Sequence, residues 1–255
     1  MNGSAAPLNS PPGSALDILK LLADDTRWRL LSALRRSDYQ VGELVGLLNL
    51  PQNLVSYHLG ILRQAGLVYM RRSDADARAI YYSLELPMLQ SGFQQIGSSL
   101  QLALDSPPSL PPLTVVFLCT ANSARSQIAE AWLRYLSGGQ ISVRSAGTEP
   151  YQLHPLTIQV MAEVGVDIGY QQAKNISALA GLHPDVTVTV CDLAREHCSD
   201  TLDAPNRLHW SVVDPLSVKG DSAAQLQTFR NVRDHLRLRV EALLALLPTL
   251  APPAG

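Results

Sequence analysis

The sequence predicts an α/β protein made of two folded domains. Its length is 255 residues, and a folded domain usually takes about 100 to 200 residues, so two domains are expected. Up to residue 84 the pattern is that of helices followed by two short strands, and a proline-rich stretch at 105–112 then interrupts it. Beyond the prolines, residues 113–118 form a short apolar, partly β-branched run, which is typical of a buried parallel strand.

The composition is that of a globular protein without a membrane span. Apolar residues make up 46% of the chain and charged residues 16%, and no uninterrupted apolar run approaches the roughly 18 residues of a transmembrane helix. Residues 1–14 are small, polar and rich in proline, and they are predicted to form a disordered tail. Because this tail lacks the basic and apolar segments of a signal peptide, the expected location is the cytoplasm.

The charges are nearly balanced in both halves of the chain. Residues 1–100 carry nine Lys or Arg against eight Asp or Glu, and the remainder carries eleven against fourteen. A domain that binds DNA through charge alone would show a strong basic excess. Any nucleic-acid partner therefore has to be inferred from motifs.

Three cysteines occur, at positions 119, 191 and 198. An odd number of cysteines in a cytoplasmic protein argues against a structural disulfide framework. It favours either thiol chemistry or simple burial, and the residues around each cysteine decide between these two interpretations.

The first domain, residues 15–104, is predicted to contain a helix-turn-helix followed by a β-hairpin. Leucines spaced three residues apart, from Leu16 to Leu22, form one apolar face of a first helix, and Asp25 or Thr26 can cap a second helix. The predicted helices cover residues 15–23, 25–34, 41–48 and 51–65, and the predicted strands cover residues 67–72 and 79–84.

This domain resembles the winged helix-turn-helix of the ArsR/SmtB repressor family. The resemblance is carried by LLADDTR at 21–27, VSYHL at 55–59 and LRQAGLV at 62–68. It implies a homodimer that binds operator DNA, with the helix at 51–65 in the major groove and the hairpin as a wing. A helix-turn-helix that serves only for dimerisation is the alternative.

The resemblance also implies which residues contact DNA. Polar side chains of the helix would face bases or phosphates, and arginines would lie on the wing. The predicted contacts are Gln52, Asn53, Ser56, Tyr57, His58, Arg71, Arg72 and Arg78.

The metal-sensing residues of that family are missing from this sequence. Residues 45–48 read VGLL where family members have paired cysteines, and the helix expected at 87–104 offers Gln94, Gln95 and Ser98 where others have Asp and His. Soft metal ions need thiolate or imidazole ligands. Neither sensor site is therefore expected in this domain.

The second domain, residues 113–249, begins with a strand, a loop and a helix. The loop reads CTANSARS at 119–126, and residues 127–136 have helical spacing. A cysteine followed by five residues and an arginine at such a junction puts a thiol among converging backbone N–H groups, with a guanidinium opposite. This arrangement binds a tetrahedral oxyanion and lowers the pKa of the thiol.

Four residues of this loop have a predicted role. Cys119 is the nucleophile, Arg125 binds two oxygens of the oxyanion, and the Ser126 hydroxyl hydrogen-bonds to the sulfur. Asn122 holds the loop in shape. The remaining residues of the oxyanion loop are Thr120, Ala121, Ser123 and Ala124.

The second domain resembles the low-molecular-weight tyrosine phosphatase fold, which thioredoxin-coupled arsenate reductases share. Further matches are SAGT at 145–148, the strand and loop at 186–192, and Asp214 followed by proline. The resemblance implies a four-stranded parallel sheet flanked by helices, ending with an amphipathic helix at 221–247. In phosphatases of this fold the residue that matches Asp214 is the general acid.

The other cysteines favour a reductase over a phosphatase. A second thiol has to attack Cys119 to expel arsenite, and a third can then form a disulfide that an external reductant reaches. The resemblance assigns these roles to Cys191 and Cys198 and names thioredoxin as the external reductant, with no bound cofactor. Phosphatases of the fold usually carry a second cysteine at the position of Ala124 and a tyrosine pair after Asp-Pro.

Three alternatives remain open for the second domain. It is a low-molecular-weight tyrosine phosphatase, or a vestigial enzyme attached to an arsenic-operon repressor, or Cys191 and Cys198 are merely buried small residues. Some related enzymes bind potassium beside the loop through Asn, Glu, Ser and Asp. Here Asn122, Glu130 and Ser145 match, but Lys174 replaces the aspartate, so potassium binding is not expected.

Overall fold

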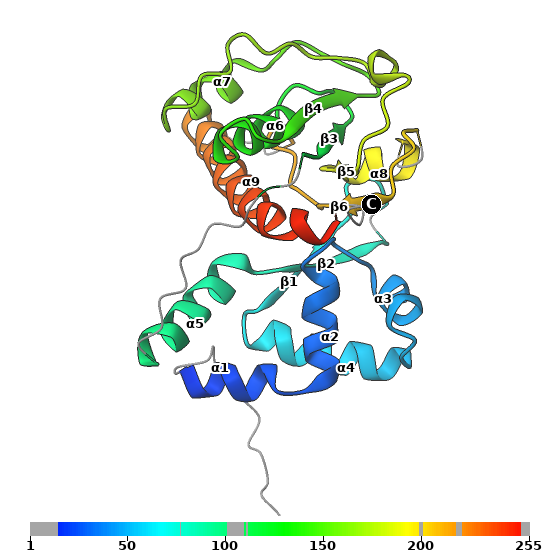
Figure 1. The fold of residues 1–255 in the computed structure, drawn as a ribbon, viewed down its shortest axis with the longest axis vertical. Coiled ribbons are helices and arrows are strands. Elements are labelled where there is room, and N and C mark those ends of the chain that lie inside the picture. The colour runs from blue at the N-terminus through cyan, green and yellow to red at the C-terminus, as the bar shows by residue number, and fades with distance from the viewer. Residues whose placement is uncertain are drawn as a thin grey trace, which may run out of the picture. The chain divides into compact units, whose positions relative to one another are not determined.

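The computed structural model describes residues 15–76, 78–100, 110, 112–198, 201–217 and 221–250. The chain divides into two compact units. The first unit contains helices α1 to α5 with strands β1 and β2, and the second contains β3 to β6 with α6 to α9 (Figure 1). The tail at 1–14 and most of the proline-rich stretch at 105–112 lie outside the described residues.

The first unit has the predicted order of helices followed by a hairpin. Strands β1 and β2 pair antiparallel, with Val68 opposite Leu84 and Arg72 opposite Ile80. The helices are α1 (Ala15–Leu22), α2 (Asp25–Leu34), α3 (Val41–Leu48), α4 (Gln52–Gln64) and α5 (Leu86–Ser99), and the strands are β1 (Val68–Arg72) and β2 (Ile80–Leu84).

Capping explains where two of these helices begin and end. The cap of α2 is Asp24, whose carboxylate accepts a hydrogen bond from the Arg27 N–H at 2.9 Å. The prediction of Asp25 or Thr26 as the cap was therefore wrong by one or two residues. Helix α4 begins directly after Pro51 and ends before Gly66, whose positive φ of 71° suits a residue without a side chain.

The second unit is built on a four-stranded parallel sheet, which confirms the predicted fold class. The strand order is β4-β3-β5-β6, and all three neighbouring pairs are parallel. The strands are β3 (Thr114–Cys119), β4 (Ser142–Gly147), β5 (Val186–Thr189) and β6 (Asn206–His209), and the helices are α6 (Arg125–Leu136), α7 (Pro155–Ala162), α8 (Asp192–Cys198) and α9 (Ser222–Leu250), with a 3-10 turn at Ile176–Leu179.

The core of the second unit lies between the sheet and its helices. Helix α6 contacts β3, β4 and α9, whereas α8 contacts β3 and β5 (Figure 1). Trp132 of α6 is buried, and its indole N–H donates to the Arg233 carbonyl of α9 at 3.1 Å. Burial of this kind of apolar surface is the main favourable contribution to folding, and it holds α6 against β3 and β4.

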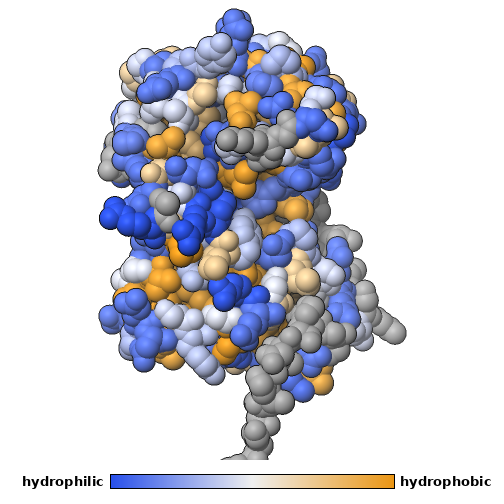
Figure 2. Space-filling view, turned by 180° about the vertical axis from the view of Figure 1, so that it is seen from behind, coloured by the Kyte–Doolittle hydropathy of each residue, from blue (hydrophilic) through white to orange (hydrophobic). Residues whose placement is uncertain are grey.

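The surface carries apolar side chains among polar ones. Figure 2 shows hydrophobic groups scattered between hydrophilic residues on one face of the molecule. Such exposure is normal for folded proteins. None of the helices in the described ranges combines the length and the apolar character needed to cross a membrane.

The ends of β3 and β4 lie side by side and fix the start of the loop. In the parallel register Cys119 pairs with Gly147, so the loop leaves β3 directly beside the end of β4. A Cβ atom on Gly147 would lie 2.3 Å from the Thr120 carbonyl oxygen and 2.9 Å from the Asn122 nitrogen. Only glycine therefore allows this strand end to approach the loop.

Gly147→Ala is expected to lower the free energy of unfolding of the second unit by about 1 to 3 kcal/mol, the usual cost of forcing extra atoms into a packed site. The loop should also lose oxyanion affinity, because Thr120 and Asn122 would be displaced. Urea unfolding and phosphate binding measure the two effects. Gly169→Ala is the control, because its new Cβ would meet only a carboxylate oxygen of Asp167 at 3.3 Å. Equal unfolding free energies and equal phosphate affinities of the two variants would contradict the steric explanation.

Candidate active site

The loop between β3 and α6 encloses the Cys119 sulfur. Asn122 adopts a left-handed conformation with a φ of 46°, which asparagine tolerates better than most residues. This turn directs the Asn122 backbone N–H at the sulfur, 3.1 Å away. Cys119 is only 3% exposed, so the thiol lies at the base of the loop as the sequence predicted.

The Ser126 hydroxyl lies 2.9 Å from the Cys119 sulfur. The side-chain amide of Asn122 donates to this same hydroxyl at 2.8 Å and to the Ser145 hydroxyl at 2.9 Å. Because Ser126 already accepts from the amide, its own proton is available for the sulfur. The network therefore orients Ser126 as a donor to a thiolate, the role predicted for it.

The pKa of the Cys119 thiol is raised above its ordinary value. Burial is the largest cause, and the nearby Cys191 raises the pKa further. Hydrogen bonds from Ser126 and Asn122 and the positive charge of Arg125 act in the opposite direction. The predicted lowering of this pKa is thus wrong for this arrangement of the loop, because the buried sulfur loses more hydration than the donors replace.

Arg125 and Asp214 meet at one side of the loop. The guanidinium donates to the Asp214 carboxylate at 3.1 Å and to the Val212 carbonyl at 3.1 Å. The Asp214 side chain keeps about a third of its surface exposed. Two residues that are 89 positions apart in the sequence are therefore brought together, as the predicted site requires.

The loop is held from outside by the segment that follows β4. The carbonyls of Thr120, Ala121 and Ser123 accept backbone hydrogen bonds from residues 149, 151 and 154 at 2.9 to 3.0 Å. Ala124, the last residue before α6, is buried. These bonds leave the loop little freedom, so its shape is set before any anion binds.

Gln127 was not among the predicted site residues, yet it supports the loop. Its side-chain N–H group donates to the Asn122 carbonyl at 3.1 Å and to the Gln172 carbonyl at 3.0 Å. A polar side chain on the fully buried side of α6 is the signal that could have identified it, because buried polar groups need hydrogen-bond partners.

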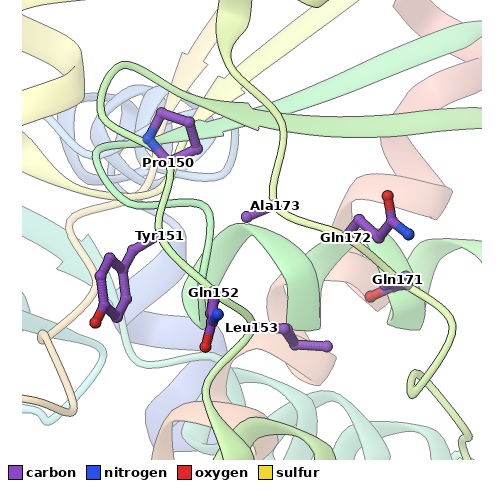
Figure 3. A pocket seen from close by; sticks show the side chains of 7 residues that line it. All are labelled: Pro150, Tyr151, Gln152, Leu153, Gln171, Gln172 and Ala173. Atoms are coloured by element: carbon purple, nitrogen blue, oxygen red, sulfur yellow. The ribbon is translucent and has the colours of Figure 1, made fainter.

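A hollow lies beside the loop, between two extended segments. Figure 3 shows its lining, formed by Pro150 to Leu153 on one side and Gln171 to Ala173 on the other. The Tyr151 N–H donates to the Ala121 carbonyl of the loop. The Gln172 carbonyl accepts from Gln127 of α6, which also donates to the Asn122 carbonyl of the loop. The hollow therefore borders the loop, but the Cys119 sulfur does not line it.

The residues that match the potassium site of related enzymes lie close to Lys174. The Ser145 hydroxyl donates to the Glu130 carboxylate at 2.5 Å, and the Lys174 ammonium lies 3.8 Å from the same carboxylate oxygen. The Asn122 side-chain oxygen accepts from the Lys174 backbone N–H at 2.8 Å. These oxygens already face protein donors and a protein cation, so the residues do not fit a potassium ion.

Cys191 lies beside the loop at the end of β5. It is buried, its sulfur lies 3.5 Å from the Thr120 hydroxyl, and the Ala194 N–H donates to it at 3.4 Å. Both Cys119 and Cys191 are free thiols. Cys198 is the last residue of α8, and its side chain lies outside the described part of the structure.

Comparison with known proteins agrees with this geometry. Residues 114–250, more than half of the chain, match the family model of the low molecular weight phosphotyrosine protein phosphatases. The chain belongs to this family.

Named relatives of this phosphatase-family domain include arsenate reductases. The arsenate reductase of Halalkalibacterium halodurans is 35% identical over 127 residues, which is 50% of this chain and 91% of the relative. That of Bacillus subtilis is 36% identical over 127 residues with the same coverage. A solved structure of an arsenate reductase in the oxidised state is 32% identical, covers 52% of this chain and 98% of that chain, and has a TM-score of 0.47.

The first unit matches a second family model. Residues 24–70 match the model of the bacterial regulatory proteins of the arsR family. The chain thus joins an arsR-type helix-turn-helix to a domain of the low molecular weight phosphatase family, as the two resemblances implied.

The predicted DNA contacts differ in their exposure. Gln52, Asn53, Ser56 and Tyr57 are exposed on α4, Arg72 and Arg78 are exposed on the hairpin, and Arg71 is half-buried. His58 is buried, and its Nδ1 lies 3.6 Å from the Asp24 carboxylate at the start of α2. The prediction that His58 contacts DNA is therefore corrected: its side chain lies among the helices of the unit.

The pKa of Cys119 is expected to fall in Cys191→Ser, because the second sulfur raises it, and to rise in Arg125→Met, because the guanidinium lowers it. Only the thiolate reacts with iodoacetamide, so the pH midpoint of Cys119 alkylation reports this pKa. Mass spectrometry of the alkylated peptide distinguishes Cys119 from the other cysteines. Midpoints that do not move, or that move in the reverse directions, would contradict the assigned causes.

Proposed function

We propose that the second domain reduces arsenate to arsenite with the thiols of Cys119, Cys191 and Cys198, and that thioredoxin regenerates them. The observation that carries this proposal is the second buried thiol beside the loop, next to Thr120. A phosphatase needs one thiolate, whereas reduction needs a second thiol within reach of the first. The names of the relatives support the choice of arsenate as substrate.

The first step joins sulfur to arsenic. Arsenate binds in the loop, where backbone N–H groups and the Arg125 guanidinium face its oxygens. The Cys119 sulfur attacks the arsenic atom and an S–As bond forms. The thiol proton and one arsenate hydroxyl leave together as water, with Asp214 beside Arg125 relaying the proton.

The second step is the reduction. The Cys191 sulfur attacks the Cys119 sulfur, an S–S bond forms, and the S–As bond breaks with its electron pair remaining on arsenic. Arsenic(V) becomes arsenic(III) and leaves as arsenite, which takes up the Cys191 proton. Two thiols are oxidised for each arsenite released, so the electrons balance.

The third step moves the disulfide outward. Cys198 attacks Cys191 and releases Cys119, which is then ready for another arsenate. Seven helical residues span about 10 Å, whereas the Cα atoms of a disulfide lie about 5.5 Å apart. Helix α8, which runs from Asp192 to Cys198, therefore has to lose its regular structure in this step.

A phosphatase is the second candidate function, and the Arg125–Asp214 pair is the observation that favours it. The carboxylate lies 3.1 Å from the guanidinium that would hold the phosphate, close to where a general acid acts on a leaving oxygen. This activity would use Cys119 and Asp214 and would not require Cys191 or Cys198.

The two functions are separated by the cysteine variants. With arsenate, thioredoxin, thioredoxin reductase and NADPH, the native chain should consume NADPH, and Cys191→Ser and Cys198→Ser should abolish this turnover because the cascade stops. Hydrolysis of p-nitrophenyl phosphate is followed in parallel, and Cys119→Ser is the control that stops both reactions. Phosphate release that persists in both variants, without NADPH consumption, would make the domain a phosphatase.

We further propose that the first domain binds operator DNA as a homodimer through α4. Support comes from the arsR-family match and from the exposed polar side chains of Gln52, Asn53, Ser56 and Tyr57 on α4. A repressor attached to an inactive enzyme remains an alternative, and it predicts tight operator binding without any turnover of arsenate.

Asn53→Ala is expected to weaken binding to the DNA upstream of the chain's own coding region by about 1 to 3 kcal/mol, the usual value of a base contact. Fluorescence anisotropy at fixed salt measures the affinity. Gln94→Ala is the matched control, because Gln94 is an exposed glutamine on α5 outside the proposed contact face. Equal affinities of the two variants would argue against α4 as the reading helix.

A further inference from the structure

His209 connects the chain on both sides of Cys191. It is the last residue of β6 and is 3% exposed. Its Nδ1 lies 2.9 Å from the Thr189 hydroxyl, and its Nε2 lies 3.2 Å from the Asp192 carboxylate. Thr189 precedes Cys191 by two residues and Asp192 follows it directly. One imidazole ring thus connects the end of β5 with the start of α8, and Cys191 lies between them.

The other bonds around this bridge fix the same piece of backbone. The Asp192 side chain is completely buried, and its carboxylate also accepts from the Ser211 hydroxyl at 2.8 Å. The Val190 N–H donates to the Leu118 carbonyl of β3 at 2.8 Å. A buried carboxylate without hydrogen-bond partners destabilises the folded protein. Moving Asp192 away from His209 and Ser211 would therefore be unfavourable.

The bridge tolerates either charge state of the ring. An ionised carboxylate can only accept, so His209 donates to Asp192 through Nε2. In the neutral ring Nδ1 accepts from the Thr189 hydroxyl. In the imidazolium Nδ1 donates instead, and the Thr189 hydroxyl can turn towards the Leu208 carbonyl, 3.4 Å away. Thr189 and Asp192 therefore stay connected in both states.

In the proposed cascade Cys191, just before α8, has to stay in place, whereas α8 itself has to change its conformation. Cys191 has to stay beside Thr120 and the Cys119 loop to attack the first sulfur. The helix that begins one residue later has to unwind so that Cys198 can approach. The backbone at the start of α8 therefore has to be held in place, so that Cys191 keeps its position while the rest of the helix unwinds.

We propose that His209 is a positioning residue for Cys191 in the disulfide-forming step. Through Thr189 and Asp192 it holds the Cys191 backbone while the rest of α8 rearranges. This role rests on the reductase function proposed above. His209 does not touch the substrate, so it acts only through the placement of the attacking sulfur.

The test uses the full chain carrying Cys198→Ser, which halts the cascade at the Cys119–Cys191 disulfide. Arsenate is added, the reaction is quenched at set times, and the linked peptides are quantified by mass spectrometry. In this background His209→Phe keeps a ring without nitrogens, His209→Gln offers one donor and one acceptor, and Thr189→Val removes only the hydroxyl.

His209→Phe is expected to slow disulfide formation at saturating arsenate by about 10-fold to 100-fold, because small misplacements of reacting groups have effects of this size. The arsenate concentration for half-maximal rate should stay within about twofold, since the loop is untouched. His209→Gln should recover much of the rate. If His209→Phe does not fold, Thr189→Val provides the test, and its rate of disulfide formation is expected to be several-fold lower than that of the parent.

Alkylation of Cys119 and its protection by arsenate report whether the loop is intact in each variant. Variants that form the disulfide at the rate of the Cys198→Ser parent overturn the positioning role. Variants in which arsenate protection of Cys119 and the rate of disulfide formation fall together also overturn the positioning role, because this result is expected when the substitution only disrupts the fold. A parent that forms no arsenate-dependent disulfide overturns the reductase function itself, and the role of His209 with it.

Discussion

The parallel pairing of β3 with β4 and β5 determines where every group of the site lies. Cys119 stands opposite Gly147, and Leu118 stands opposite Thr189, two residues before Cys191. In parallel sheets the carboxyl ends of neighbouring strands share one edge, where ligands bind. Both thiols and the loop therefore gather at one edge of the sheet from distant parts of the sequence.

The site depends on a balance between burial and polar contacts. Burial keeps water from the Cys119 sulfur and raises the pKa of its thiol, while Ser126, Asn122 and Arg125 partly compensate. Arg125, the residue proposed to bind the oxyanion, forms an ion pair with the Asp214 carboxylate at 3.1 Å. Behind the loop Glu130 is held by Arg134 at 2.6 Å and by Lys174 at 3.8 Å, so its buried charge is matched within the chain.

Local signals were enough to predict the helices and hairpin of the first unit and the strand, loop and helix around Cys119. Apolar spacing placed the helices of the first unit, and Cys119 and Arg125 at a strand-to-helix junction identified the oxyanion loop. The four-stranded parallel sheet was predicted only from the family resemblance, and its strand order, β4-β3-β5-β6, became known only from the structure, because apolar runs do not show which strands pair.

Other features depended on contacts that no local pattern encodes. The pKa of Cys119 could not be predicted from its loop alone, because it is raised mainly by burial and further by the nearby Cys191, and both depend on how the chain folds around the loop. Burial of His58 against Asp24 depends on the packing of α4 on α2, and the bridge from His209 to Thr189 and Asp192 depends on the β6 register. The support that Gln127 gives to the loop likewise appears only once the loop is folded.

In the proposed mechanism, oxyanion binding at Cys119 leads to electron transfer from protein thiols. A single turnover of the native chain with arsenate and no external reductant, in which released arsenite and remaining free thiols are counted, separates this from simple oxyanion binding. We expect one arsenite per chain and the loss of two of the three thiols. Arsenate that protects Cys119 from alkylation while all three thiols stay free and no arsenite appears would contradict it.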